Sequence, residues 1–474
     1  MARARIHYLS DNEKEFIHEK VLEVLADVGI AYNTPEAIDL LEAAGAQVDR
    51  ENLTAKLTWD IIEPALKTAP KQVLLAGRVP EVDVVLGGDR WICTSDGMTT
   101  NVLDDMTGEM RSGTVEDLAR FTRLTDAIPE IDTLWPSPQT GDVDAHNMPL
   151  VMQATMVRNS VKHVQDEVRA PEMVDPILEM YEVAAGAKLT ERPYFSVTNC
   201  TIAPLQHDRE MTEAGLLMCK RGVPIFVLPM PLIGTTGPGT VLSNCIVQLA
   251  ELLSGIVLYQ LANPGCATIA GVGAGLTDMR RGGYVSASPE IGITNMICVE
   301  MAKFYGLLVQ ATGMSSDAKA ANFQAGSEGG MTALVAALIG SDSLIAAGGL
   351  DGIQLSSLAK TILDVEQIGA LRRYMREDPI DEEHALMDDI KAIGMGGHYL
   401  GRKATRTFAR TEIWQPEIFQ RGPFVNYADQ PIVKQAVEKA EQILATYEPA
   451  PLPAGAEERI QGVLDEWAAS KVTA

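Results

Sequence analysis

The glycine-rich segment Gly234-Thr235-Thr236-Gly237-Pro238-Gly239-Thr240 combines residues that could hold a ligand. Its glycines would let the backbone come close to a bound group. Free N–H groups at the start of a following helix favour an anion or a carboxamide oxygen. No lysine follows the last glycine, so the segment is not a Walker loop. A helix start shaped only by proline and threonine explains the segment equally well, and the sequence leaves both interpretations open.

Charged side chains with possible chemistry lie in three further places. Asp317 belongs to a long polar stretch, residues 315–326, which is typical of a lid or a binding loop. Glu251 lies inside an apolar helical run, either as a buried acid turned toward a site or as part of the polar face of the helix. Arg280 and Arg281 could grip a carboxylate with paired hydrogen bonds, although a surface ion pair explains them as well.

Metal and hydrolase chemistry find no support in the sequence. The seven histidines show no spacing of metal ligands, and only His163 lies inside a predicted strand. No Gly-x-Ser-x-Gly segment occurs, so a hydrolase triad is not indicated. The six cysteines are scattered singly, which is typical of small core residues in a reducing compartment.

The elements that must position these residues follow a repeated alternation of short apolar runs and amphipathic helices. Eight such units predict a parallel sheet with crossover helices that closes into a (β/α)8 TIM barrel. Function is then expected where the strands end. The predicted strands are residues 91–94 or 101–103, 133–135, 162–165, 194–199, 225–228, 267–270, 307–311 and 344–347. The helices between them include residues 115–127, 172–185, 208–221, 240–262, 289–305 and 331–338.

The barrel does not account for the whole chain. We expect an N-terminal helical cap over residues 1–90, the barrel over residues 91–375 and a C-terminal helical extension over residues 376–474. The cap is predicted to hold two helices before residue 45 and a third at residues 58–68. Nothing in the cap is of a reactive type.

The charge balance limits the partners of the protein. With 39 basic and 64 acidic side chains the net charge is −25, which repels phosphate backbones and anionic lipid. Nucleic acid and a membrane surface are therefore poor partners, and a cationic substrate or a basic patch on another protein fits better. Simple solubility is the commoner reason for such a charge. The start of the chain has no apolar leader segment, so we expect a soluble, cytoplasmic protein.

A set of short segments recurs in order along most of the chain. They are Lys162-His163, Ala203-Pro204-Leu205, Gly234-Thr235-Thr236-Gly237-Pro238, Ala250-Glu251, Asp278-Met279-Arg280, Ser288-Pro289-Glu290, Phe304-Tyr305-Gly306, Ser316-Asp317-Ala318-Lys319, Gln324-Ala325-Gly326, Gly397-His398-Tyr399-Leu400, Trp414-Gln415-Pro416 and Phe419-Gln420-Arg421. In these segments the chain resembles the trimethylamine methyltransferase family. The non-pyrrolysine members of that family are corrinoid-dependent methyltransferases acting on glycine betaine and other quaternary amines.

The resemblance implies a methyl transfer from a methylated amine to the Co(I) corrinoid of a separate carrier protein. Trimethylamine enzymes of the family carry pyrrolysine, which we place in the stretch of residues 317–326, and every residue there is standard in this chain. Glycine betaine is therefore the expected donor. The alternatives are trimethylamine, proline betaine or carnitine as donor, and a non-catalytic barrel that binds methylated osmolytes. A homo-oligomer is also expected.

A trimethylammonium group has no N–H to donate, so its pocket should use aromatic faces. The aromatic candidates near predicted strands and their loops are Trp135, Tyr194, Phe195, Tyr284 and Phe323, although side chains of this kind are more often core residues than cage residues. For such a reaction we expect Glu251 and Asp317 to be catalytic and to lie near the methylammonium group together with the aromatic residues. We expect the carboxylate of a betaine near Arg280, His163 or residues 234–240, a substrate contact from Gln324, and corrinoid contacts from Gly234, Thr235, Thr236 and Gly237.

Overall fold

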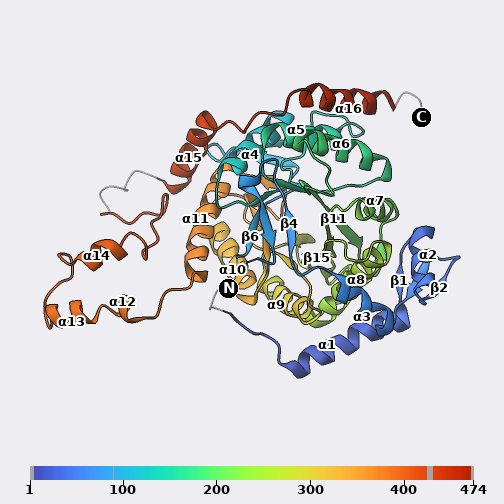
Figure 1. Cartoon of the computed structure of the whole chain (residues 1–474), viewed down its shortest axis with the longest axis horizontal. Helices are drawn as coiled ribbons and strands as arrows, with labels where there is room; N and C mark the ends of the chain where they lie inside the picture. The colour runs from blue at the N-terminus through green and yellow to red at the C-terminus, as the bar shows by residue number, and fades with distance from the viewer. Residues whose placement is uncertain (1–4, 89, 424–430, 471–474) are drawn as a thin grey trace.

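The computed structural model of the chain describes residues 5–88, 90–423 and 431–470. Eight parallel strands pair edge to edge in the order β10-β9-β6-β19-β18-β15-β13-β11, and β11 pairs back with β10. The predicted TIM barrel is therefore confirmed (Figure 1). The barrel strands are β6 (Ile92–Ser95), β9 (Thr133–Leu134), β10 (His163–Glu167), β11 (Phe195–Ile202), β13 (Ile225–Leu228), β15 (Thr268–Val272), β18 (Val309–Thr312) and β19 (Ser343–Ala347).

One long helix follows each barrel strand and covers the outside of the sheet. These helices are α4 (Val115–Ala127), α5 (Met148–Asn159), α6 (Val174–Ala185), α7 (Arg209–Lys220), α8 (Val241–Ala262), α9 (Pro289–Phe304), α10 (Phe323–Ile339) and α11 (Leu358–Met375). By length and composition α8 would suit a membrane span. However, 78% of its most apolar window is buried inside the protein, as in a core helix.

The interior of the barrel is unusually polar. The side-chain amides of Gln165 and Gln310 bond each other across it at 2.8 and 2.9 Å. The Thr94 hydroxyl lies 2.8 Å from that of Thr133, and both are buried. A buried polar network of this kind is stable only when its groups are paired, and it then favours one register of the strands.

A β-hairpin closes the barrel at the amino ends of its strands. The hairpin consists of β4 (Val73–Leu75) and β5 (Val84–Leu86), with the 3-10 turn η2 (Pro80–Val82) between them. Its apolar side chains form one buried cluster with Ile92, Phe226, Ile269 and Leu308, which lie near the starts of barrel strands. A ligand therefore reaches the barrel interior only from the carboxyl ends of the strands, which we call the mouth.

Residues before the hairpin form a helical layer against the barrel. Its elements are α1 (Asp11–Glu23), the π-helix η1 (Val24–Val28), β1 (Ile30–Ala31), α2 (Pro35–Ala43), β2 (Gln47–Asp49), β3 (Thr54–Lys56) and α3 (Trp59–Thr68). A capping box formed by Ser10 and Glu13 begins α1. The three predicted helices are present, whereas the short strands between them were not predicted.

Two small sheets build the rim of the mouth. The first consists of β14 (Leu232–Ile233), β16 (Gly275–Asp278) and β17 (Gly283–Val285), and the second of β20 (Gly349–Leu350), β21 (Leu355–Ser356), β7 (Asn101–Leu103) and β8 (Met110–Ser112). The sequence allowed either of two segments, residues 91–94 or 101–103, to be the first barrel strand. The structure assigns residues 92–95 to the barrel and residues 101–103 to the rim.

The remaining described elements are mostly helical. The short elements β12 (Gln206–His207) and η3 (Pro171–Met173) lie within the barrel region, and α12 (Glu382–Ala385), α13 (Met387–Ile393), α14 (Lys403–Phe408), α15 (Ile432–Thr446) and α16 (Ala456–Ser470) follow it. Helix α15 packs on α11 and α4, and α16 packs on α6 and α5. By contrast, α12 to α14 stand away from the barrel in Figure 1.

Candidate functional site

Two buried acids and a tryptophan meet at the mouth because their strands are neighbours. Asp96 follows β6, Trp135 follows β9, and Asp166 lies near the end of β10. The Trp135 Nε1 donates to Asp166 Oδ1 at 3.2 Å, and the Gln153 amide donates to the other oxygen of this carboxyl. The indole also packs tightly on Gly97, where a Cβ would lie 2.3 Å from Trp135 Cγ. The tryptophan is thus held in one place.

The Asp96 carboxyl is buried with little to stabilise its charge. Its Oδ1 accepts from Gly97 N at 2.9 Å, and this is its one hydrogen bond to the described residues. A Cβ on Gly349 would lie 1.5 Å from Oδ2, so the acid fits only against glycine. Burial raises the pKa of Asp96 to about 7, and burial likewise raises the pKa of Asp166 to about 7. Both acids are therefore poised to ionise when a cation lies beside them.

Tyr284 and Asp317 form the opposite side of the mouth. The Tyr284 ring lies between two glycines: a Cβ on Gly275 would be 2.3 Å, and one on Gly352 3.0 Å, from ring carbons. Asp317 accepts from Ser286 N at 2.9 Å, from the Ser286 hydroxyl at 3.0 Å and from the next backbone N–H at 3.2 Å. Asp317 thereby anchors the segment that carries the tyrosine.

The phenol of Tyr284 stays protonated at neutral pH. Burial, together with the negative charges of Asp317 and Asp96, raises the pKa of Tyr284 to about 12. The ring nevertheless remains open to solvent on one side, since 42% of the residue is exposed. An aromatic face close to two acids is thus available to an incoming ligand.

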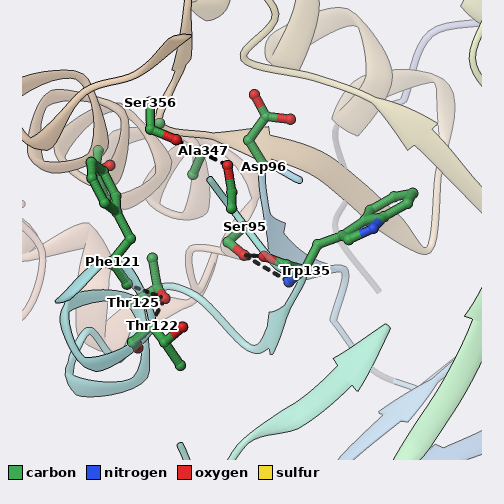
Figure 2. A pocket seen from close by; sticks show the side chains of 11 residues that line it. Ser95, Asp96, Phe121, Thr122, Thr125, Trp135, Ala347 and Ser356 are labelled. Carbon is green, nitrogen blue, oxygen red and sulfur yellow. Dashed lines mark hydrogen bonds between the residues drawn. The ribbon is translucent and has the colours of Figure 1, made fainter. Parts of the chain in front are cut away.

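Apolar side chains and a narrow cavity complete the mouth. Trp135, Leu228 and Ile345 form a buried cluster with Met98 and Cys200. Beside it a cavity of about 20 Å³, room for about one water, is lined by the ends of β6, β9 and β19 and by α4. Figure 2 shows Asp96 and Trp135 on one side of Ser95, with Phe121, Thr122 and Thr125 on the other. A larger ligand requires the rim to open.

A much larger cavity, of about 1050 Å³, lies at the opposite end of the barrel. Its lining includes Arg5, Lys71, Arg90, Lys303 and Arg372, which come from the amino terminus, the hairpin region and the ends of helices. The hairpin separates this cavity from the barrel interior. Because TIM barrels place their chemistry at the carboxyl ends of the strands, we assign the candidate site to the mouth.

Three of the residues predicted for the substrate lie away from the mouth. His163 begins β10, and its Nδ1 lies 3.0 Å from two backbone carbonyls while its Nε2 lies 2.8 Å from the Ser196 hydroxyl. Burial lowers the pKa of His163 to about 4, so the ring is neutral and fully paired. Tyr194 and Phe195 are buried against Tyr181 of α6, on the outer side of the barrel wall.

Glu251 faces the end of β11 and the segment that follows it. Its carboxyl accepts from the Thr201 hydroxyl and, at 2.8 Å, from Leu205 N. Burial raises the pKa of Glu251. The structure therefore shows this acid holding a loop, and it does not bring it into contact with Trp135 or Asp96.

The other predicted residues lie on the rim. Gly234, Thr235 and Thr236 are exposed, and Gly237 packs on Asn244. The Thr235 hydroxyl lies 2.8 Å from that of Thr277 in β16.

Arg280, Phe323 and Gln324 complete the list of predicted residues. Arg280 lies in the turn between β16 and β17 and makes no ion pair with the described residues, whereas Arg281 pairs with Asp278 at 3.0 Å. Phe323 is 90% exposed at the start of α10, and Gln324 donates to Glu328 at 2.8 Å.

The structure thus brings Trp135, Tyr284 and Asp317 together with two acids that sequence reasoning missed, Asp96 and Asp166. A signal for both acids existed. Asp166 directly follows residues 162–165, which were predicted as the third strand. Asp96 lies two residues beyond residues 91–94, one of the two segments predicted for the first strand. Acids at those positions of a parallel barrel face the mouth or its rim.

Comparisons with known proteins agree with this architecture. Residues 2–470 match the family described as Trimethylamine methyltransferase (MTTB). Two relatives come from Desulfitobacterium hafniense. Trimethylamine methyltransferase MttB is 29% identical, covering 96% of this chain and 93% of the relative, and Glycine betaine methyltransferase is 28% identical, covering 97% of each.

A solved structure shows the same fold. The Methanosarcina barkeri monomethylamine methyltransferase (MtmB) aligns with a TM-score of 0.53 at 13% identity, over 98% of this chain and 90% of that one. Because the family match covers nearly the whole length and its named members are methyltransferases, the protein is an enzyme of that kind, and the chain belongs to the trimethylamine methyltransferase family.

Proposed function

We propose that this protein transfers a methyl group from a quaternary amine, with glycine betaine favoured, to the Co(I) corrinoid of a carrier protein in the cytoplasm. The observation that carries the proposal is the pair of buried acids at the mouth: Asp166 is bonded to Trp135, and Asp96 is close enough to Tyr284 to raise the pKa of its phenol. The name of the relative Glycine betaine methyltransferase supports the choice of donor.

The mouth combines aromatic faces with buried carboxyls, and both attract a permanent cation. A trimethylammonium group is attracted to aromatic faces by roughly 0.5 to 2 kcal/mol for each good contact. It cannot lose its charge, so it also favours the ionised form of nearby carboxyls whose pKa is raised. Asp317 acts through position, because it anchors the segment that presents Tyr284. Opening of the rim provides the room that the narrow cavity lacks.

The reaction needs little proton chemistry from the protein. When bound, the reduced corrinoid supplies the nucleophile that takes the methyl group. The electron pair of the broken C–N bond stays on nitrogen, which leaves as a neutral tertiary amine, so no acid has to protonate it. The residues of the mouth therefore orient the ammonium group and exclude water.

The rim fits the approach of a flat corrin ring. Gly234, Thr235 and Thr236 are small and exposed, and Gly237 is so close to Asn244 that a Cβ would lie 1.7 Å from its Oδ1. That Oδ1 is buried and accepts no hydrogen bond from the described residues. We assign the corrin contact to this segment. Arg280, on the neighbouring hairpin, would hold the carboxylate of a betaine.

A quaternary donor is favoured over trimethylamine. In the resemblance, pyrrolysine marks the trimethylamine enzymes, and residues 317–326 are all standard here. Proline betaine and carnitine present the same charged group and remain alternatives, as does a barrel that only binds methylated osmolytes.

The test measures methyl transfer from each donor to free cobalamin reduced to Co(I). The reaction is monitored by the absorption change that accompanies formation of methylcobalamin. We expect turnover with a quaternary amine and none with trimethylamine. Trp135→Ala should lose turnover, whereas Trp135→Phe, which keeps an aromatic face, should retain part of it. No methylcobalamin from glycine betaine, proline betaine or carnitine would contradict the proposal. Tight betaine binding by calorimetry without turnover would instead support the binding barrel.

A further inference from the structure

The segment between α11 and Trp414, residues 377–413, forms an arm that leaves the barrel and returns to it. The arm departs where α11 ends at Met375. It rejoins α11 where Glu366 accepts hydrogen bonds from the backbone of Glu417, Ile418 and Phe419 at 3.0 to 3.2 Å. Its two ends are also tied to the end of α11, since Arg373 pairs with Asp378 and Arg376 with Glu412. Between these ties, α12 to α14 stand clear of the body of the protein, as Figure 1 shows.

The arm buries no core of its own. Its helices α12, α13 and α14 have 4, 7 and 6 residues, and none contains a buried residue. Isolated helices of this length are unstable in water. Large apolar side chains point outward instead, with Ile380 85% and Leu400 78% exposed and Met395 fully exposed. A segment of this kind needs another surface to cover it.

The charges of the arm are segregated along the chain except for Glu412, which pairs with Arg373 and Arg376 of the α11 end. Residues 377–389 contain acids and neither lysine nor arginine, whereas residues 390–411 contain bases and no acid. The acids are Glu377, Asp378, Asp381, Glu382, Glu383, Asp388 and Asp389, and the bases are Lys391, Lys403, Arg402, Arg406 and Arg410. The second half of the arm is thus a basic patch in a chain of net charge −25.

Few of these charges are used within the chain. Arg402 pairs with Asp389, which folds α14 back on α13, and Asp378 and Asp381 also have partners. The others make no ion pair with the described part of the chain. These are Glu377, Glu382, Glu383 and Asp388 in the acidic half and Lys391, Lys403, Arg406 and Arg410 in the basic half.

We propose that the arm is a dimerisation element that pairs with the arm of a second copy of this chain across a two-fold axis. Under such an axis the acidic half of one arm faces the basic half of the other, and the same pairing occurs twice. The exposed apolar side chains of both arms are then covered together. Opposite charges at the edge of the contact select this arrangement over an acid-on-acid one.

The position of the arm favours a second copy over a carrier protein. The end of α11 lies at the amino end of the barrel, because Arg372 donates to Asp132, which directly precedes β9, at 2.8 Å. On the proposed function, a carrier has to reach the mouth, at the other end. The base of the arm therefore lies at the end of the barrel opposite the mouth.

The experiment is a charge swap measured by analytical ultracentrifugation of the full chain. The base-reversed variant carries Lys403→Glu, Arg406→Glu and Arg410→Glu, and the acid-reversed variant carries Glu382→Lys, Glu383→Lys and Asp388→Lys. The matched control, Glu51→Lys, Glu81→Lys and Glu191→Lys, changes the charge of exposed acids outside the arm as the acid-reversed variant does.

We expect the wild type and the control to have an even number of subunits and each arm variant to have half the mass or less. An equal mixture of the two arm variants should recover the wild-type mass, because both charge pairings are restored. A monomeric wild type, unchanged mass in the arm variants, or no recovery in the mixture would each overturn the proposal.

Hydrogen exchange of the wild type gives a second measurement that needs no variant. Amides of residues 382–393 and 403–408 should become protected as protein concentration rises through the dissociation range. Exchange that is independent of concentration while the mass changes would show that the dimer forms elsewhere. Protection of these amides only on adding the corrinoid carrier would likewise overturn the proposal in favour of the carrier.

Discussion

Replacing Asp96 by asparagine should make the protein more stable at alkaline pH. In the folded protein the pKa of this carboxyl is raised from 3.8 to about 7 by burial. An acid with a raised pKa binds its proton more tightly when folded, so its contribution to stability is full below the unfolded pKa and is lost as pH rises through the folded one. The amide of an asparagine side chain does not titrate, so the variant lacks this loss.

The size of the effect follows from the shift. Three pKa units correspond to about 4 kcal/mol, of which roughly two units, about 2.7 kcal/mol, fall between pH 5 and pH 8. The absolute difference between the two proteins at pH 5 also includes the exchange of one O–H donor for the two N–H donors of the amide, which does not depend on pH. The stability of the variant relative to the wild type should therefore rise by roughly 2.7 kcal/mol between pH 5 and pH 8.

Urea unfolding at pH 5 and pH 8 measures this difference. The quantity of interest is the change with pH in the free energy of unfolding of Asp96→Asn relative to wild type, since contributions of Asp166 and other acids cancel in it. Glu191→Gln, at an exposed loop position, is the control and should follow the wild type. If Asp96→Asn also follows the wild type at both pH values, the Asp96 carboxyl is already charged in the folded protein and the reasoning is refuted.

Three further predictions concern the mouth and its support. Calorimetry should show tighter glycine betaine binding as pH rises from 6 to 8, because the mouth acids ionise, and Asp96→Asn should flatten this dependence; weaker binding at high pH would contradict it. Lys360→Met should cost about 3 to 5 kcal/mol in urea unfolding by leaving buried Asp364 unpaired, and Lys360→Met with Asp364→Leu should recover much of that loss. Gly97→Ala should lower turnover and shift Trp135 fluorescence, since a Cβ there meets the indole at 2.3 Å; an unchanged emission spectrum would show that the ring is not held there.

The buried pair of Lys360 and Asp364 connects helix α11 to two loops of the mouth. Lys360 Nζ donates to the Met314 carbonyl at 3.1 Å, and Asp364 accepts from Gly348 N at 2.9 Å. One ion pair on α11 therefore ties down the loops after β18 and β19. Such support lies outside the site but sets the position of the Gly349 backbone against Asp96.

Local sequence patterns determined the barrel. Short β-branched or apolar runs such as β13 and β15 alternate with helical stretches along the chain, so their order predicts eight parallel units without knowledge of contacts. The rim sheets escaped prediction, because strands of two to four residues carry no periodic signal and form only where the loops of different units meet. The first strand was ambiguous for the same reason.

The chemistry of the site depended on tertiary structure. A sequence shows that His163, Tyr194 and Phe195 lie near a strand start, but only the closed barrel shows that this end is plugged by a hairpin. It also shows Glu251 satisfied by Thr201 and Leu205. Residue type and spacing thus determined the fold and the family resemblance. Burial, which raises the pKa of Asp96 and Asp166, arises from neighbours distant in the chain, so only the folded structure could reveal it.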